Sequence, residues 1–432
     1  MPDPARQPVP PCQIIGFGPA AISFLIAADR TGLLPDLLRA GLVIHEAEPD
    51  VDALLQRGIN YDIVSNSAAS DFLKGIRPDG AFAEALDRPL AALLRQTGDR
   101  PVPLQLVAAF EAELRQDVLR LVRRFPQSRI RFGRRILCLR SGPNDGPNDG
   151  PVEGPGITAI DEDGTETVSR RALLACGSIP VIPDALAGAA ARHGVRLIHS
   201  ERFLRPAGAT ALPGDAGRIV IVGGSHSAFS ILHKLLEETG GDRPAIDILH
   251  RAPIRRMHLS AAAARAAGEA FDPVADVCPA SGRVFRFQGL YTRSRALYEQ
   301  VRAGLHARVR LVEIASDGAL DQAIAGAGLV IAGTGYRPRL PRLEDAGGRP
   351  LDPGTVTANC AIDARGRLCD GQGVPFDGLM GLGLGFGRRN TGIGEPSHAG
   401  APVGINIFQG ADGEALCRHL ADQTTKDQRK AG

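Results

Sequence analysis

Two short glycine-rich turns are the segments whose residue types and spacing point most clearly to chemistry. The first, GFGPAA at 16–21, follows a short predicted strand at 13–15 (QII) and precedes the apolar helical stretch 22–28. In such a strand-turn-helix unit, the first glycine allows a tight turn and the second lets the backbone approach a pyrophosphate. A small residue at the sixth position lets the helix pack closely on the strand, and its N-terminus offers free N–H groups to the phosphates. We therefore expect a dinucleotide to contact Gly16, Gly18, Pro19, Ala20 and Ala21.

An acidic residue ends the next predicted strand. The apolar run 42–45 is followed by Glu46, whose carboxylate could accept hydrogen bonds from both hydroxyls of a ribose. Glu46 comes thirty residues after Gly16, against about 20 in the usual pattern, so we expect an inserted helix or loop between them. A chance glycine turn is the alternative, but the strand before it, the helix behind it and this acid favour a nucleotide site.

The second turn, GGSHSA at 223–228, follows the apolar strand 219–222. Ser225 stands where the pattern has its middle glycine, although its N–H and hydroxyl could still serve a phosphate. The strand after it ends in His250-Arg251 instead of an acid, and a guanidinium can bind a 2′-phosphate through two hydrogen bonds. This favours NADPH over NADH, unless the arginine belongs to a merely solvated loop. The expected cofactor contacts are Gly223, Gly224, Ser225, His226, Ser227 and Arg251, with His226 facing the nicotinamide cofactor.

A hydrolase is a weaker interpretation of the same turn. The nucleophile elbow G-x-S-x-G also joins a strand to a helix, but Ser227 occupies the place of its second glycine. Because the chain already has one nucleotide-type turn upstream, a second such turn explains the segment better.

The composition limits the class of protein. A chain of 432 residues predicts two or three domains, and 44% hydrophobic residues allow a large core. A net charge of +2 and an aromatic content of 4% argue against nucleic-acid partners. No apolar run is long enough to span a membrane, and the histidines and cysteines lack metal-site spacing. Seven scattered cysteines without a C-x-x-C pair, and no signal peptide, predict a cytoplasmic protein.

The two turns, together with 173–180 (LLACGSIP) and 332–335 (AGTG), resemble the flavoproteins with two dinucleotide-binding domains. The last two segments look like that superfamily's paired "ATG" turns, where the chain crosses between domains; this assigns Gly177 and Gly335 to the cofactor sites. The resemblance implies an α/β fold with two Rossmann-like domains. The FAD domain would be discontinuous, at 10–185 and 336–420, with an NADPH domain inserted at 186–335 and a flexible tail at 421–432.

Within that superfamily, the segments 16–19, 333–338 (GTGYRP) and 395–400 (EPSHAG) are similar to the class B flavin monooxygenases. The resemblance is strongest to the amine N-hydroxylating branch that acts on ornithine or lysine. It implies FAD and NADPH as cofactors, and O₂ with a small amine or amino acid as substrates. A C4a-(hydro)peroxyflavin would be the oxygenating species, in secondary metabolism, and a homo-oligomer is compatible with this family.

The same resemblance suggests residues beside the flavin. The segment 60–73 lies where the family has residues near the isoalloxazine, which makes Asn66 and Ser67 catalytic candidates; an ordinary turn is the alternative. His398 could relay a proton, since histidine titrates near neutral pH, or make only a structural contact. Glu395 and Gly387 are assigned to the flavin site.

Three other readings stay open at this point. An FAD-binding oxidase or dehydrogenase, or a flavin-binding protein without NADPH turnover, would account for Ser225. A pyridine-nucleotide:disulfide reductase would need a redox cysteine pair that the sequence lacks. The choice between N-oxygenation, S-oxygenation and Baeyer-Villiger oxygenation depends on a substrate that the motifs do not identify.

Overall fold

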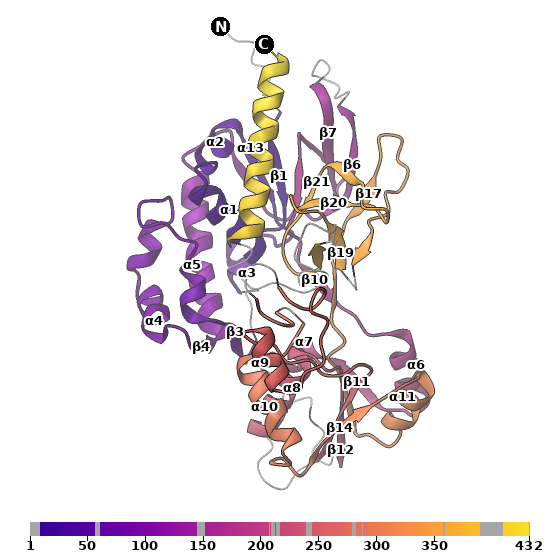
Figure 1. Cartoon of the computed structure of the whole chain (residues 1–432). Coiled ribbons are helices and arrows are strands. Elements are labelled where there is room, and N and C mark those ends of the chain that lie inside the picture. The colour runs from indigo at the N-terminus through magenta and orange to yellow at the C-terminus, as the bar shows by residue number, and fades with distance from the viewer. Residues whose placement is uncertain are drawn as a thin grey trace.

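The chain folds into two units, each built around a parallel sheet, as the computed structural model shows (Figure 1). The structure describes residues 9–56, 61–144, 152–206, 208, 212, 217–238, 244–278, 282–286, 288–356, 359–388 and 409–431.

The first unit contains a nine-stranded sheet in the order β18-β19-β20-β21-β9-β1-β2-β5, with β22 paired to β19. Its centre is parallel: Ile14 of β1 lies opposite Ile44 of β2 and Leu173 of β9. All three side chains are fully buried, as expected for short apolar strands covered on both faces. The strands are β1 (Cys12–Ile15), β2 (Leu42–His45), β5 (Arg129–Arg131), β9 (Ala172–Leu174), β18 (Thr355–Val356), β19 (Asn359–Ile362), β20 (Arg367–Cys369), β21 (Pro375–Gly381) and β22 (Phe386–Arg388).

Helices cover this sheet, and α1 packs against both α5 and the C-terminal helix α13 (Figure 1). Phe24 of α1 and Phe110 of α5 are fully buried in the core between them. The helices of this unit are α1 (Pro19–Arg30), α2 (Leu34–Ala40), α3 (Val51–Gln56), η1 (Ala69–Phe72), η2 (Ala83–Asp87), α4 (Pro89–Thr97), α5 (Leu104–Val122) and α13 (Ala411–Ala431).

Three smaller sheets complete the architecture. One has four strands in the order β17-β6-β7-β8, and the pairs β3–β4 and β10–β16 are two-stranded. Their bounds are β3 (Val64–Ala68), β4 (Pro101–Pro103), β6 (Ile136–Asn144), β7 (Val152–Asp161), β8 (Glu166–Ser169), β10 (Ser178–Pro180), β16 (Tyr336–Pro338) and β17 (Arg342–Glu344).

The second unit has a five-stranded parallel sheet in the order β11-β15-β12-β13-β14. Its strands are β11 (Arg196–His199), β12 (Arg218–Val222), β13 (Ala245–His250), β14 (Val309–Glu313) and β15 (Leu329–Ala332). Its helices are α6 (Asp184–Arg192), α7 (Ser200–Phe203), α8 (His226–Glu238), α9 (Ala261–Ala266), α10 (Thr292–Arg302) and α11 (Asp317–Ile324).

The two sheets share one topology. The order β5-β2-β1-β9 in the first corresponds to β14-β13-β12-β15 in the second, and in each the strand order reverses beside the strand that carries the glycine turn. Ligands bind at such switch points, outside the carboxyl ends of the strands. The α/β class with two Rossmann-like sheets is therefore confirmed, whereas the domain boundaries at 185/186 and 335/336 stay a prediction. The strands β10 and β16, which lie beside those boundaries, pair antiparallel with each other.

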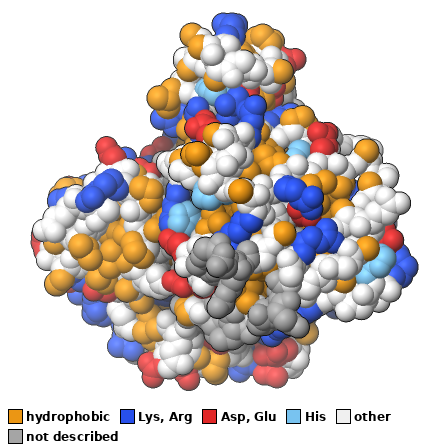
Figure 2. Space-filling view, turned by 90° about the horizontal axis from the view of Figure 1, so that it is seen from below, with side chains coloured by type: hydrophobic (Ala, Val, Ile, Leu, Met, Phe, Trp, Pro, Cys, Tyr) orange, Lys and Arg blue, Asp and Glu red, His pale blue; other side chains and the backbone are white. Residues whose placement is uncertain are grey.

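The helix α13 continues to Ala431, so residues 421–431 are helical, and the flexibility that the sequence suggested for this tail stays a prediction. Lysine, glutamine and alanine, which recur there, have high helix propensity. Within the described residues, no helix is both long enough and apolar enough to cross a membrane. The face seen from below carries basic and acidic side chains interspersed, as the small net charge implies (Figure 2).

Candidate functional site

A cavity of about 800 Å³ opens at the carboxyl ends of β1, β2 and β9. Its walls come from the loop 16–20, residues 45–47, the loop 175–178 and one side of α5. Segments distant in sequence close it, at 134–137, 339–342 and 383–384. Gly16, Gly18, Pro19, Ala20, Glu46 and Gly177 line this one cavity, and Ala21 is buried directly behind it.

The loop after β1 has the geometry that its glycines predict. Gly16 has φ +101°, and a Cβ there would lie 2.6 Å from the carbonyl oxygen of Ala175. No described residue lies within 4 Å of a Cβ built at Gly18, so the described part of the chain leaves room beside its backbone. Within the described residues no side chain caps the N-terminus of α1, which leaves N–H groups of its first turn available. These features suit a pyrophosphate bound at the helix N-terminus.

Glu46 lies at the end of β2 and is buried. Its carboxylate accepts hydrogen bonds from the N–H groups of Phe17 and Glu48, both at 2.9 Å. Each oxygen keeps a second lone pair, so the carboxylate can still accept ribose hydroxyls. The long spacing between Gly16 and Glu46 has a structural cause, because α2 is inserted between α1 and β2.

The sequence did not indicate Glu111 or the arginines that line this cavity, and two of these charged residues face each other. Glu111 and Arg115 lie one turn apart on α5, and both line the cavity although their side chains are 6% and 3% exposed. Burial raises the pKa of Glu111 to about 7, although Arg115 lowers it. The available signal was their position on the apolar face of the helix, between Val107 and Val118.

The loop after β12 repeats the close approach of the first loop. Gly223 has φ +136°, and a Cβ there would lie 2.5 Å from the carbonyl oxygen of Gly333. Gly224 packs against protein instead, since a Cβ would lie 3.0 Å from Ile254. Ser225 is exposed at the start of α8, and Ser227 is half-buried one residue into it. Gly335, after the neighbouring strand β15, has φ +91° with nothing near its missing Cβ.

His226 and Arg251 flank this second loop. The His226 ring packs edge-on to the ring of Tyr291, with centroids 4.5 Å apart. Burial lowers the pKa of His226 to about 4, so the ring is neutral at neutral pH. Arg251 is exposed at the end of β13 and forms an ion pair with Asp317, the first residue of α11. A 2′-phosphate would have to compete with that carboxylate.

Of the residues that the sequence assigned to the flavin site, the structure describes Asn66, Ser67 and Gly387. Asn66 and Ser67 lie on β3. Tyr61, which precedes that strand in the sequence, and Phe72, which follows it, line the cavity. Gly387 lies on β22, where it pairs with Ala361 of β19, and the glycine of this run that lines the cavity is Gly383. His398 and Glu395 lie outside the described residues.

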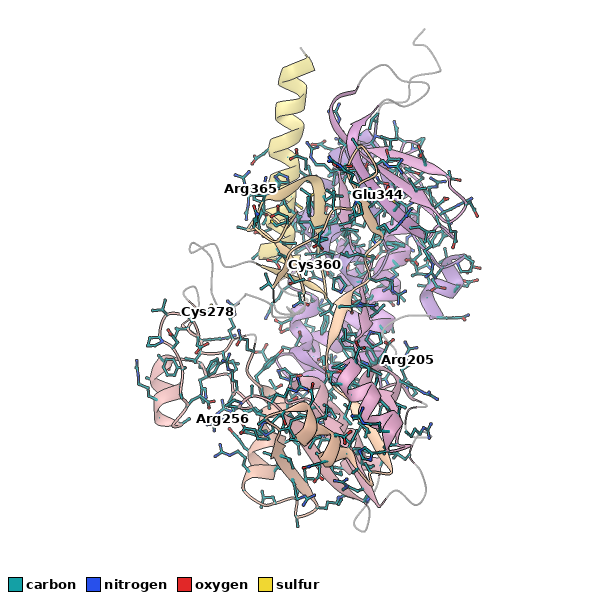
Figure 3. All side chains as sticks on the ribbon, turned by 90° about the vertical axis from the view of Figure 1, so that its right-hand side faces the viewer. Arg205, Arg256, Cys278, Glu344, Cys360 and Arg365 are labelled. Carbon is teal, nitrogen blue, oxygen red and sulfur yellow. The ribbon has the colours of Figure 1, made fainter. Side chains whose placement is uncertain are left out.

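The two units meet beside the cavity. Arg205, which lines it, lies at this junction (Figure 3). The Arg205 carbonyl accepts a hydrogen bond from Nζ of Lys234 at 3.1 Å. The same Nζ atom donates to Asp62, which lies just before β3. This contact ties α8 of the second unit to the strand that carries Asn66.

The two Rossmann-like sheets, each with a glycine turn at its switch point, define the class of the two-dinucleotide-binding-domain flavoproteins. The protein family described as L-lysine 6-monooxygenase/L-ornithine 5-monooxygenase matches residues 122–274. A CMP-5'-(3-aminopropyl)phosphonate hydroxylase from Streptomyces rubellomurinus is 32% identical, over 96% of this chain and 98% of that protein.

Solved structures share the fold. An ornithine N-hydroxylase from Kutzneria sp. 744, in a complex with reduced FAD, NADP⁺ and L-ornithine, superposes with a TM-score of 0.53 at 14% identity, covering 96% of this chain and 100% of that one. An FAD-bound cadaverine monooxygenase of desferrioxamine biosynthesis from Erwinia amylovora superposes with a TM-score of 0.53 at 14% identity. The match covers 96% of this chain and 95% of that one. Because it is 32% identical to the Streptomyces hydroxylase over nearly the full length of both proteins, this chain belongs to the amine N-hydroxylating branch of the class B flavin monooxygenases. It is a flavin-dependent monooxygenase, an oxidoreductase.

Proposed function

We propose that the enzyme uses FAD and NADPH to N-hydroxylate a small primary amine that carries an anionic group. FAD would occupy the cavity at the first glycine turn and NADPH the second turn. When bound, FAD accepts hydride and activates O₂, redox chemistry that amino-acid side chains lack. The chain's own residues bind and orient the two dinucleotides and keep water from the reacting atoms.

The full-length relative carries the substrate proposal. That protein hydroxylates CMP-5'-(3-aminopropyl)phosphonate, so we propose an aminoalkyl phosphonate, free or as its nucleotide ester, as the substrate class here. The cavity itself suits the phosphates of FAD, because basic side chains outnumber the acids Glu46 and Glu111 in its walls. Those basic residues are Arg115, Arg134, Arg135, Arg205, Arg339 and Arg342.

The test has three steps. The purified protein should be yellow, NADPH should bleach the flavin absorbance under anaerobic conditions, and mass spectrometry should find one added oxygen atom on an aminoalkyl phosphonate. Ornithine, lysine, a diamine, a thioether and a ketone are the comparison substrates. A colourless protein that does not take up FAD would contradict the proposal. A yellow protein that neither NADPH nor NADH reduces would favour an oxidase or dehydrogenase, the function that Ser225 leaves open.

We propose that Arg251 selects NADPH through its 2′-phosphate. Arg251→Ala should then raise the KM for NADPH about tenfold, the effect of losing one charge-assisted hydrogen bond, and leave the KM for NADH nearly unchanged. Arg192→Ala is the matched control, since Arg192 forms a comparable exposed ion pair with Asp321 of the same helix α11. Equal effects of Arg251→Ala on both nucleotides would exclude this role.

We propose that Asn66 lies beside the flavin and helps to keep oxygen transfer coupled to NADPH oxidation. Asn66→Ala should release most of the consumed reducing equivalents as hydrogen peroxide, while NADPH oxidation continues at a similar rate. The measurement is peroxide formed and product formed per NADPH consumed. Ser70→Ala is the control, because the Ser70 hydroxyl donates to Asp99 at an exposed position just after β3. Unchanged coupling would remove Asn66 from the site.

The proton-relay role of His398, the catalytic role of Ser67, the flavin contacts of Glu395 and Gly387, the cytoplasmic location and a homo-oligomeric state stay predictions. They follow from the sequence alone.

A further inference from the structure

A buried ion pair on α5 faces the first glycine turn. The Nη2 atom of Arg115 lies 3.4 Å from Oε2 of Glu111, and Nε of Arg115 donates to the carbonyl oxygen of Phe17 at 3.3 Å. Phe17 lies between the two glycines of the turn, so the guanidinium contacts the backbone that shapes the proposed phosphate site. Both side chains are almost completely buried, yet both line the cavity.

The hydrogen bonding of this guanidinium is incomplete. Nη1 of Arg115 is buried and has no hydrogen-bond partner among the residues that the structure describes, and the contact to Glu111 is long for a charge-assisted bond. An unsatisfied buried donor is unfavourable, and in native structures such a group calls for a missing partner. Arg115 contacts the turn through the Phe17 carbonyl, and the same turn leads into the N-terminus of α1, where no described side chain forms a cap. The guanidinium and the first N–H groups of α1 therefore lie on the same turn, and both are donors that suit an anion.

The charge of the pair depends on pH near neutrality. Because the pKa of Glu111 is raised to about 7, the carboxyl is partly protonated there, and the pair then carries a net positive charge. Burial and Arg115 set this pKa. The other charged or titratable groups in the described cavity wall are His45 and Glu46 at the end of β2, Tyr61 before β3, Arg134 and Arg135 before β6, Cys176 after β9, Arg205 after α7, Arg339 before β17 and Arg342 at its start. Of these, His45 is neutral at neutral pH, because burial lowers its pKa to about 4.

We propose that Arg115 binds the pyrophosphate of the dinucleotide at the first glycine turn through Nη1, and that Glu111 takes up a proton when the dinucleotide binds. The inference rests on the proposed function in that FAD is the ligand. A diphosphate near Glu111 disfavours its carboxylate by like-charge repulsion. Protonation of Glu111 also frees the guanidinium from its ion pair, so that the whole positive charge faces the phosphates.

The experiment uses protein freed of flavin and titrated with FAD, followed by fluorescence for Kd and by calorimetry in buffers of different ionisation enthalpy for proton uptake. Arg115→Met should raise the Kd for FAD at least about tenfold, and Arg115→Lys should recover part of the loss. Glu111→Gln should abolish the proton uptake, which in the wild type grows as pH rises through about 7. Its affinity for FAD should match the wild type below that pH and exceed it above, because no carboxylate has to be protonated. The competitor ADP, which carries the pyrophosphate, should lose affinity for Arg115→Met in parallel.

Arg88→Met is the matched control for loss of a partly buried arginine. Arg88 forms an ion pair at 2.9 Å with Asp117 of α5, the helix that also carries Arg115. Arg88 is not among the residues that line the cavity. It should lower thermal stability and leave the Kd for FAD unchanged. If the wild type binds no FAD, the proposed function itself fails. If the wild type binds FAD and Arg115→Met binds it equally well, only this inference is overturned. If Arg115→Met does not fold, unchanged proton uptake in Glu111→Gln overturns it.

Discussion

Gly16→Ala is expected to yield a protein that cannot hold flavin. The substitution places a methyl group 2.6 Å from the carbonyl oxygen of Ala175, closer than carbon and oxygen can approach. That oxygen belongs to backbone directly after β9 in the sheet core, so it cannot turn away. The residue also has φ +101°, a conformation that costs on the order of 1–3 kcal/mol for a residue with a side chain. The loop must therefore move out of the cavity, and the measured ratio of FAD to protein should fall close to zero.

Gly223→Ala tests the second turn in the same way. Its methyl group would lie 2.5 Å from the carbonyl oxygen of Gly333, at φ +136°. Because this turn belongs to the other sheet, the variant should keep its FAD but lose anaerobic reduction by NADPH. Gly32→Ala is the control for a positive φ alone: Gly32 has φ +77° at the end of α1, with nothing within 4 Å of the added atom. A Gly16→Ala protein with full FAD content would remove the first turn as the flavin site.

Both turns could be predicted because their signal is local. A buried strand, a glycine with positive φ and a helix start follow one another within a few residues, so the order of residue types determines the geometry. Sequence spacing also indicated an insertion before Glu46, and the structure has α2 there. The fold class followed from the repetition of this unit about 200 residues apart.

The cavity wall could not be predicted in the same way. Arg115 meets the carbonyl of Phe17 across a separation of 98 residues, and the helical period does not tell which distant loop a helix face will contact. The assignment of Gly387 illustrates the same limit. Many glycines in one run suggest that its backbone passes close to a ligand, but they do not tell which glycine does so. In the structure Gly383, with φ +108°, lines the cavity, and Gly387 pairs with Ala361 within a sheet.

Asp62→Ala is expected to loosen the junction between the two units. Lys234 of α8 is 3% exposed, and its ammonium donates to Asp62 Oδ2 at 3.0 Å and to the carbonyl of Arg205 at 3.1 Å, with Glu238 at 3.5 Å. The backbone N–H of Asp62 donates to Leu204 of the second unit at 2.7 Å. Removing the carboxylate takes away one of three acceptors of a buried ammonium. Because the Asp62 side chain is itself 53% exposed, the free energy of unfolding should fall by about 1 kcal/mol. Denaturant unfolding of the two proteins measures this difference.

The pH dependence separates this ion pair from general damage. The hydrogen bond from Lys234 holds the pKa of Asp62 below its usual 3.8, so the stabilisation is fully present above that value and is lost as pH falls through the lowered pKa. The difference between wild type and Asp62→Ala should therefore be constant from neutral pH down to about pH 4 and shrink in stronger acid. Lys234→Met removes the charge together with its need for acceptors and should destabilise less than Asp62→Ala. Asp36→Ala, which breaks an exposed pair with Arg39, should have almost no effect. If Asp62→Ala cost no more than Asp36→Ala, the orientation of α8 towards β3 would have to depend on the packing of Tyr61 and Ile63 against the second unit's core instead.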